Sequence, residues 1–259
     1  MSTELERWER AEVERSASEA SHFDTTRLVS ADLSRYLNPP ADTCYPLEYS
    51  FHLLGDVRGL TVLEYGCGDG ENTVALAKRG AGRVLALDIS PDLIEIARRR
   101  LEVNGVASGV EFVVGSAHDV PLADGSVDVV FGMAILHHLD LKLAAREVRR
   151  VLRPGGRAIF QEPVRSSPLL RAARRLIPYK APDVSPFERP LTDGELEQFA
   201  KGYSSYRAKS FLLPSTNVLN LLPGLRRQAA RWYRWDAAVL RRIPALNYYA
   251  SIRVVEMIK

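Results

Sequence analysis

Cysteine is scarce in this sequence, and long hydrophobic runs are absent from it. The 259 residues include only Cys44 and Cys67, too few for a disulfide framework or a zinc cluster. No stretch reaches the roughly 18 apolar residues that a membrane span requires. The charged N-terminal segment lacks the apolar core of a secretory signal. These absences predict a soluble cytoplasmic protein with no metal site.

Net charge is nearly absent from the chain as a whole, but not from its two halves. The total is only +3. Residues 1–140 contain 12 lysines and arginines against 23 aspartates and glutamates, a net charge of −11. Residues 141–259 contain 23 against 9, a net charge of +14. The near-neutral total therefore hides an acidic first half and a basic second half.

Short apolar segments alternate with helical ones in the middle of the chain. Strands are expected at 60–66, 83–88, 110–115, 126–132 and 157–163, with helices at 71–81, 91–105 and 141–156. This alternation predicts an α/β fold in which helices cover both faces of a parallel sheet.

The flanking regions are less regular. An N-terminal helix is expected from the spacing of Leu5, Trp8, Glu12 and Arg15. Residues 31–46 are rich in proline and asparagine and are expected to be irregular. Thr192 and Glu195 form a capping box that opens a helix. Further expected elements are strands at 205–213 and 251–258 and helical structure over 214–247.

The strongest motif is the loop Glu64-Tyr65-Gly66-Cys67-Gly68-Asp69-Gly70, between the first expected strand and its helix. Ligands of open α/β sheets bind beyond the carboxyl ends of the strands, and glycines let the backbone approach them closely. Asp88 ends the next strand, where an acid typically binds ribose hydroxyls. The loop therefore predicts a nucleoside site.

The acids of this loop argue against a dinucleotide. A dinucleotide fingerprint requires a third glycine at position 71, which is Glu71. Asp69 and Glu71 also place negative charge where a pyrophosphate would meet a helix N-terminus. A nucleoside without phosphates fits better, and S-adenosylmethionine, with its sulfonium and ammonium groups, is such a ligand.

On these motifs the chain resembles the class I S-adenosylmethionine-dependent methyltransferases, closely over residues 55–162 and loosely elsewhere. The segments that carry the resemblance, in order, are VLEYGCGDG, LALDIS, VVGSAHDVPLADGSVDVVFG, AILHHL and VLRPGGRAIF. The resemblance implies a Rossmann-like, seven-stranded, mostly parallel sheet with an antiparallel last strand and an α-helical cap. It also implies S-adenosyl-L-methionine as cofactor and S-adenosyl-L-homocysteine as product.

The resemblance also implies which residues bind the cofactor. Glu64 is expected to orient the loop and the methionine end, Asp88 to bind the ribose, and Ile89 to lie beside the adenine. Most relatives have an aspartate at the position of Ser116, where it bonds the adenine amino group; Ser116 would accept that bond more weakly. The expected set is Glu64, Gly66, Cys67, Gly68, Gly70, Asp88, Ile89, Ser116, Ala117 and Gly132.

Few catalytic groups are expected, because the cofactor already activates its methyl group and the protein mainly aligns the acceptor. His137 and His138, just beyond the fourth strand, are candidate bases, with His137 preferred. Alternatively, one of them caps the following helix and packs under the sheet. Glu162 is a candidate base or ligand of a substrate amine, or a structural carboxylate bonded to loop amides.

The N-terminal residues 1–54 are interpreted as a helical lid, and residues 55–259 as the methyltransferase domain. Cap inserts are expected at about 163–190 and 212–247. His22, Tyr36 and Tyr45 are candidate substrate contacts, with simple aromatic packing as the alternative.

Two segments, 165–180 and 225–243, hold most of the net charge of the second half, +5 each out of +14. The first interpretation is a solvated face of the cap, the second is peripheral contact with an anionic membrane, and the least favoured is nucleic acid. The predicted function is methyl transfer to an apolar or amphiphilic small molecule at O, C or N, similar to quinone and natural-product methyltransferases. The alternatives are an RNA methyltransferase and a non-catalytic membrane-surface protein; the oligomeric state stays open.

Overall fold

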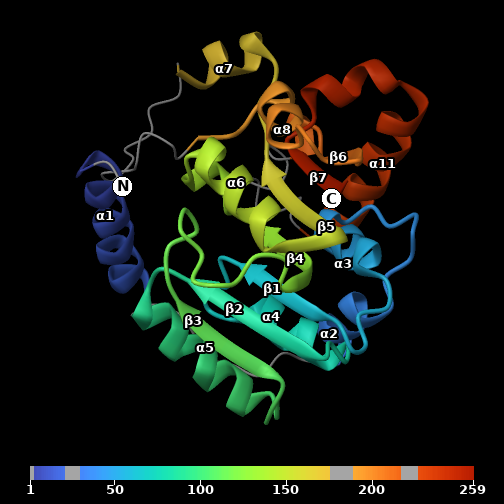
Figure 1. Ribbon diagram of the computed structural model, residues 1–259. Helices are drawn as coiled ribbons and strands as arrows, with labels where there is room; N and C mark the ends of the chain where they lie inside the picture. Colours follow the sequence, from blue (N-terminus) through green and yellow to red (C-terminus); the bar gives the residue numbers. More distant parts are fainter. Residues whose placement is uncertain (1–2, 21–29, 176–188, 217–226) are drawn as a thin grey trace.

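The computed structural model describes residues 3–20, 30–175, 189–216 and 227–259, and it is built around one seven-stranded sheet (Figure 1). The strand order is β3-β2-β1-β4-β5-β7-β6. All neighbours are parallel except β7, which runs antiparallel to both β5 and β6. The strands are β1 (Thr61–Tyr65), β2 (Arg83–Asp88), β3 (Val110–Val114), β4 (Val127–Met133), β5 (Leu152–Pro163), β6 (Ser205–Phe211) and β7 (Ile252–Ile258). The expected fold, including the antiparallel last strand, is confirmed.

Helices cover both faces of this sheet. They are α1 (Thr3–Ala20), α2 (Ser30–Leu37), α3 (Pro46–Leu54), α4 (Glu71–Lys78), α5 (Pro91–Val103), α6 (Leu141–Val151), α7 (Pro168–Arg175), α8 (Asp193–Phe199) and α11 (Ala229–Arg242), with 3-10 turns η1 (Leu136–His138) and η2 (Pro244–Tyr249). The apolar sides of α6 and α8 pack on one face, and those of α3 and α4 pack on the other. Strands buried on both faces explain the continuous apolar runs in the sequence.

Local signals in the sequence account for several of the helix boundaries. The Ser90 hydroxyl accepts the Leu93 N–H at 3.3 Å at the start of α5. The Thr192 and Glu195 side chains make the reciprocal bonds of the expected capping box at the start of α8. These caps satisfy N–H groups that have no partner within the helix, so the chain turns into each helix at a defined residue.

Two expectations about secondary structure were wrong. Residues 31–46 are not irregular throughout, because α2 occupies Ser30–Leu37 and its Leu33 packs against the core under α3. The helix that Pro154 and Gly155 were expected to stop ends earlier, at Val151. Pro154 disfavours a helical residue before it, and Leu152 instead pairs with Val127 in the sheet.

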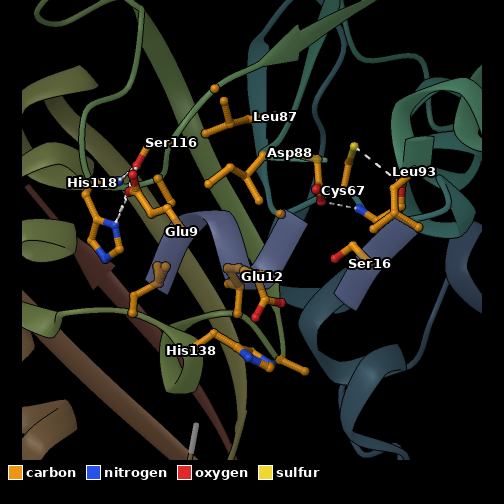
Figure 2. Close-up of a pocket in the computed structure, with 18 of the residues that line it drawn as sticks. Glu9, Glu12, Ser16, Cys67, Leu87, Asp88, Leu93, Ser116, His118 and His138 are labelled. Atoms are coloured by element: carbon orange, nitrogen blue, oxygen red, sulfur yellow. Dashed lines mark hydrogen bonds and ion pairs between the residues drawn. The ribbon is translucent and has the colours of Figure 1, made fainter. Parts of the chain in front are cut away.

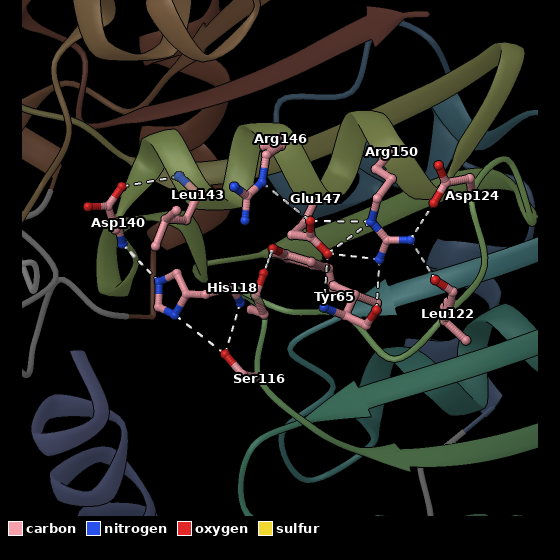
Figure 3. A network of polar contacts seen from close by, with 12 residues as sticks. Tyr65, Ser116, His118, Leu122, Asp124, Asp140, Leu143, Arg146, Glu147 and Arg150 are labelled. Carbon is pink, nitrogen blue, oxygen red and sulfur yellow. Dashed lines mark hydrogen bonds and ion pairs between the residues drawn. The ribbon is translucent and has the colours of Figure 1, made fainter. Parts of the chain in front are cut away.

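A buried polar network ties α6 to the loop that follows β3 (Figure 3). The Arg150 guanidinium bonds the buried Glu147 carboxylate at 2.8 Å and the Val120 carbonyl at 2.8 Å. Glu147 in turn accepts the Val120 N–H at 3.1 Å. In the same loop, the His118 ring accepts the Asp140 N–H at 3.0 Å. This network holds the loop after β3 rigidly beside the carboxyl ends of the strands.

No helix in the described ranges has the length and apolar character needed to cross a bilayer.

Candidate active site

A cavity lies at the carboxyl ends of β1, β2, β3 and β4, and α1 lies across it (Figure 2). α1 and the loop after β3 form one wall, and the glycine loop and the turn after β4 form the others. The lining residues are Leu5, Trp8, Glu9, Glu12, Arg15, Ser16, Gly66, Cys67, Gly68, Asp69, Glu71, Asn72, Leu87, Asp88, Ile89, Leu93, Gly115, Ser116, Ala117, His118, Met133, Ala134, Ile135, His138 and Leu139. The cavity is thus where the fold predicts a ligand.

The glycine loop follows a path that larger residues would block. Gly66 has φ of +80°, and a Cβ there would lie 2.8 Å from the Ile135 side chain. Gly70 has φ of +84°, and a Cβ there would lie 2.9 Å from the Ala97 Cα. Side chains at these two positions would be both strained and sterically excluded. Gly70 therefore serves the packing of α4 on α5 and does not itself line the cavity.

Asp69 of the loop is held by a buried arginine. The Arg100 guanidinium, from α5, bonds the Asp69 carboxylate at 2.5 Å and the Asp69 carbonyl at 2.9 Å. The Arg100 side chain is only 3% exposed. This ion pair offsets the Asp69 charge and fixes the loop at its centre.

Asp88 joins the end of β2 to the glycine loop. Its carboxylate accepts the Gly68 N–H at 2.8 Å and the Ser90 N–H at 2.9 Å. Burial raises the pKa of Asp88, and these backbone donors oppose that shift by favouring the carboxylate. Asp88 also lines the cavity beside Ile89. It is therefore a preorganised acceptor for ligand hydroxyls.

Glu64 lies beneath the same loop and is 1% exposed. Its Oε2 accepts a hydrogen bond from the Thr73 hydroxyl at 2.5 Å, whereas its buried Oε1 has no partner among the described residues. Burial raises the pKa of Glu64 to about 8, and the nearby Asp88 and Asp69 charges add to the shift. An unpartnered buried oxygen of this kind is costly. Glu64 does not itself line the cavity, but a cationic ligand group close by would favour its carboxylate form and lower its pKa again.

Cys67 is a packing residue in this geometry. Its thiol is buried, and burial together with the Glu64 and Asp88 charges raises its pKa well above the usual range. A protonated, buried thiol is a poor nucleophile.

The structure separates the two candidate histidines. His138 lines the cavity, and its Nδ1 lies 3.5 Å from the Arg15 guanidinium of α1. Burial, with the neighbouring His137 and Arg15, lowers the pKa of His138 to about 3, so its ring is neutral at pH 7. His137 does not line the cavity; its ring lies behind that of His138, with centroids 4.1 Å apart. The preference for His137 is therefore not supported by its position.

Glu162 is fully buried at the end of β5 and does not reach the cavity. Its Oε1 accepts the Ile135 N–H at 2.9 Å and the Leu136 N–H at 2.8 Å. Its Oε2 lies 2.9 Å from His137 Nδ1. This corresponds to the structural alternative, a carboxylate bonded to loop amides, because the turn after β4 otherwise leaves these donors buried without partners.

Other expected site residues lie away from the cavity. Tyr36 packs against Phe51 with ring centroids 5.1 Å apart, and Tyr45 packs against Tyr233, also at 5.1 Å. Both tyrosines therefore correspond to the aromatic-packing alternative, and Tyr36 also packs against the core under α3. Gly132 also does not line the cavity, since a Cβ there would lie 2.6 Å from the Phe160 ring. The remaining substrate candidate, His22, lies outside the described residues.

Sequence reasoning missed three contributors to the site: Glu9, His118 and Arg100. The helical spacing of α1 was the available signal for Glu9, because the four residues used to predict that helix all line the cavity with it. His118 and Arg100 offered no comparable signal, since each acts through a partner distant in sequence: Glu9 for His118 and Asp69 for Arg100.

The charge of the cavity favours a cation. The described residues that line it include five acids, namely Glu9, Glu12, Asp69, Glu71 and Asp88, and one arginine, Arg15. Even with Glu12 paired to Arg15 and both Asp69 and Glu71 beside Arg100, these five acids outnumber the two arginines, which stabilises a cationic ligand.

The fold and this site define a class of protein. Residues 63–160 match the family described as methyltransferase domain. Over these residues the chain is therefore similar to the methyltransferase domain family, and the seven-stranded sheet and the glycine loop agree with that similarity.

Particular relatives cover parts of the chain. Demethylmenaquinone methyltransferase of Lactococcus lactis is 34% identical over 137 residues, covering 52% of this chain and 53% of that protein. Fatty-acid O-methyltransferase of Mycolicibacterium smegmatis is 33% identical over 159 residues, covering 60% and 50%. A solved S-adenosylmethionine-dependent methyltransferase from Mesorhizobium loti shares the fold with a TM-score of 0.56 at 18% identity, covering 86% of this chain and 100% of that one. The chain thus spans about half the length of these two curated relatives.

The residues present fit S-adenosylmethionine. Gly68 lines the cavity, and a Cβ there would meet nothing within 4 Å, so the loop leaves open space for a ligand. The free Oε1 of Glu64 and the acidic lining suit the ammonium and sulfonium groups. Asp88 would hold the ribose, and Ile89 would lie against the adenine.

We expect Glu64→Gln to flatten the pH dependence of stability. The folded-state pKa of about 8 exceeds the ordinary value of 4.5. The contribution of Glu64 is therefore complete below about pH 4.5 and is lost as the pH rises towards 8, by at most about 1.4 kcal/mol per pH unit. The neutral glutamine does not titrate, so the variant should gain stability relative to the wild type between pH 5 and 8.

Urea unfolding at pH 5, 6.5 and 8 measures this effect. The exposed Glu102→Gln is the matched control and should retain the wild-type pH dependence. If the free energy of unfolding changed with pH equally in the wild type and in Glu64→Gln, the raised pKa of Glu64 would be contradicted.

Proposed function

We propose that this protein transfers a methyl group from S-adenosyl-L-methionine to an apolar or amphiphilic small molecule and releases S-adenosyl-L-homocysteine. The observation that carries the proposal is the acidic cavity at the glycine loop, where Asp88 is held by the Gly68 N–H at 2.8 Å. The two free cysteines fit a reducing, cytoplasmic setting.

The cofactor supplies an activated methyl group when bound. The chain's own task is then to bind, align and exclude water. Asp88 would accept ribose hydroxyls, the Gly66–Asp69 backbone would hold the amino-acid end, and Glu64 would offer its free oxygen to the ammonium group. We propose that α1 acts as a lid, because six of its residues line the cavity; enclosure strengthens the electrostatic contacts inside.

The lid in this proposal is narrower than residues 1–54, since α2 and α3 pack against the sheet and α4. Residues 55–259 form the methyltransferase domain, with segments near 163–190 and 212–247 as the cap over the acceptor. Parts of both segments lie outside the described residues.

The acceptor class rests on the relatives and on the cap. The names of two relatives specify a menaquinone precursor and a fatty acid, both largely apolar. The described part of the cap exposes large apolar side chains, among them Leu169 and Trp235. An apolar acceptor with some anionic character would also match the basic second half of the chain. Natural-product biosynthesis is the corresponding setting.

We expect calorimetry with S-adenosylhomocysteine to show binding to the wild-type protein, and Asp88→Ala to weaken it at least about tenfold. The variant loses both the ribose acceptor and the anchor of the Gly68 N–H, and each charged hydrogen bond contributes roughly 1.5–3 kcal/mol. Asp92→Ala, at an exposed position on α5, is the control. If the folded wild-type protein did not bind S-adenosylhomocysteine, the proposed methyl transfer would be refuted. If Asp88→Ala bound it as tightly as the wild type, the role of Asp88 at the ribose would be refuted. Product mass spectrometry with labelled cofactor and metabolite extract then identifies the acceptor.

For catalysis, we propose that His138 contacts the acceptor as a neutral hydrogen-bonding group. His137 and Glu162 hold the His138 ring in position. With a pKa of about 3, His138 is a weak base. We expect His138→Ala to lower the rate of product formation about tenfold. The shape of the pH–rate profile between pH 5 and 8 should be the same as in the wild type, because His138 does not titrate in that range. The control is His52→Ala, whose ring bonds the Pro39 carbonyl away from the cavity. A rate that follows a group titrating near pH 6.5 and lost in His138→Ala would contradict this role.

A second proposal concerns the basic segments 165–180 and 225–243, described here over 165–175 and 227–243. The α11 face that carries exposed Arg231 and Arg234 also carries Trp235, which is 53% exposed. Nearby η2 exposes Tyr248, whose hydroxyl donates to the Ser166 carbonyl at 3.2 Å and so joins η2 to the residues just before α7. Arginines beside exposed aromatic side chains fit the interface of an anionic bilayer.

Liposome flotation tests the membrane proposal. We expect wild-type protein to float with phosphatidylserine-containing vesicles and not with purely zwitterionic ones, and Arg231→Glu with Arg234→Glu to lose this association. The control is Arg83→Glu with Arg99→Glu, a matched charge change at exposed positions on β2 and α5. Equal flotation of both double variants, or salt-sensitive retention of RNA with no vesicle binding, would contradict the proposal.

A further inference from the structure

Glu9 reaches from α1 across the cavity to the loop after β3 (Figure 2). Its Oε1 accepts a hydrogen bond from the Ser116 hydroxyl and lies 2.9 Å from His118 Nδ1. The Glu9 side chain is 14% exposed and the His118 side chain 5%. A carboxylate from a separate helix is therefore held inside the cavity by two groups of the sheet loop.

The polarity of these contacts is determined by their other partners. The Ser116 oxygen accepts the His118 N–H at 2.9 Å, so its own hydrogen is directed to Glu9. His118 Nε2 accepts the Asp140 N–H at 3.0 Å, so in the neutral ring the proton resides on Nδ1 and is also donated to Glu9. Both donors use Oε1, and none of the described residues donates a hydrogen bond to Glu9 Oε2. One carboxylate oxygen is thus committed to the protein, and the other is left for a ligand.

The strand order places this oxygen at one end of the cavity. Ser116 follows β3, at the sheet edge, whereas the glycine loop follows β1, with β2 and Asp88 between them. A nucleoside whose ribose is held at Asp88 and whose amino-acid chain lies at the glycine loop must extend its base towards β3. The free oxygen of Glu9 therefore faces the base and not the reacting methyl group.

We propose that Glu9 selects a 6-amino purine, by accepting a hydrogen bond from the exocyclic amine of the cofactor's adenine on Oε2. This inference rests on the proposed function, since it assigns the base end of the same site. A 6-oxo purine would bring an acceptor against a carboxylate, which costs binding energy instead of adding to it. The direct adenine bond expected for Ser116 is replaced by one through Glu9, which Ser116 positions.

Calorimetry with S-adenosylhomocysteine and its 6-oxo analogue, S-inosylhomocysteine, tests the assignment. We expect wild-type protein to bind the adenine ligand about thirtyfold more tightly. In Glu9→Gln the amide oxygen should remain with His118, which can only donate there, and the amide NH₂ should face the base. Compared with the wild type, the variant should therefore bind the adenine ligand more weakly and the 6-oxo ligand at least as tightly. The preference for the adenine ligand should then fall below about threefold.

Two further variants keep the test decisive. Glu6→Gln, an exposed position on the same helix, should preserve the wild-type ratio. Glu9→Asp keeps the charge but is one methylene shorter, so it should lose the ratio as well if the hydrogen bond and not the charge is responsible. Equal affinities of the wild type for both ligands, or a Glu9→Gln variant that weakens both by one factor, would overturn the role of Glu9. Absence of S-adenosylhomocysteine binding to the wild type would instead overturn the proposed function.

Discussion

The contact between the glycine loop and the end of β2 is the constraint on which the rest of the site depends. The N–H groups of Gly66 and Cys67 both donate to the Leu87 carbonyl, at 3.0 and 2.8 Å, and that of Gly68 donates to the Asp88 carboxylate. A loop held by its own backbone in this way needs no ligand to acquire its path. The carboxylate that would bind the ribose is therefore the same group that shapes the loop.

Buried carboxylates repeat this device around the cavity. Glu162 holds the turn after β4 through two backbone N–H groups, and Glu147 holds the loop after β3 through the Val120 N–H. Each removes backbone donors from an unsatisfied state that would be expensive in a closed interior. Glu64 differs, because one of its oxygens has no partner in the described structure. That contrast distinguishes a carboxylate that completes the scaffold from one suited to a ligand.

The uneven charge along the chain corresponds to two surfaces of different character. The acidic half includes α1 and the glycine loop, whose carboxylates line the cavity proposed for a sulfonium cofactor. The basic half includes α11, where arginines and Trp235 lie exposed on one face. If the proposed function holds, cofactor and acceptor approach the protein through fields of opposite sign, which separates their encounters electrostatically.

The alternation of strands and helices, the glycine loop and Asp88 were all readable in the sequence, because each depends on residues close together along the chain. Periodicity and turn residues express local backbone preferences, and so the parallel part of the sheet and the caps at Ser90 and Thr192 were predicted correctly. The antiparallel last strand was implied by the family resemblance and not by local pattern. The boundary of α6 was not, since pairing of Leu152 with β4 outweighed the helical pattern.

Only the tertiary structure decided which of the two adjacent histidines lines the cavity and that Glu162 supports a turn. It likewise decided that Tyr36 and Tyr45 pack against other aromatic rings and that Glu9 meets Ser116, 107 positions away along the chain. These outcomes depend on how separate elements pack and on where buried donors find acceptors. Such contacts leave no periodic trace in the sequence, because neither partner's local environment along the chain records the other.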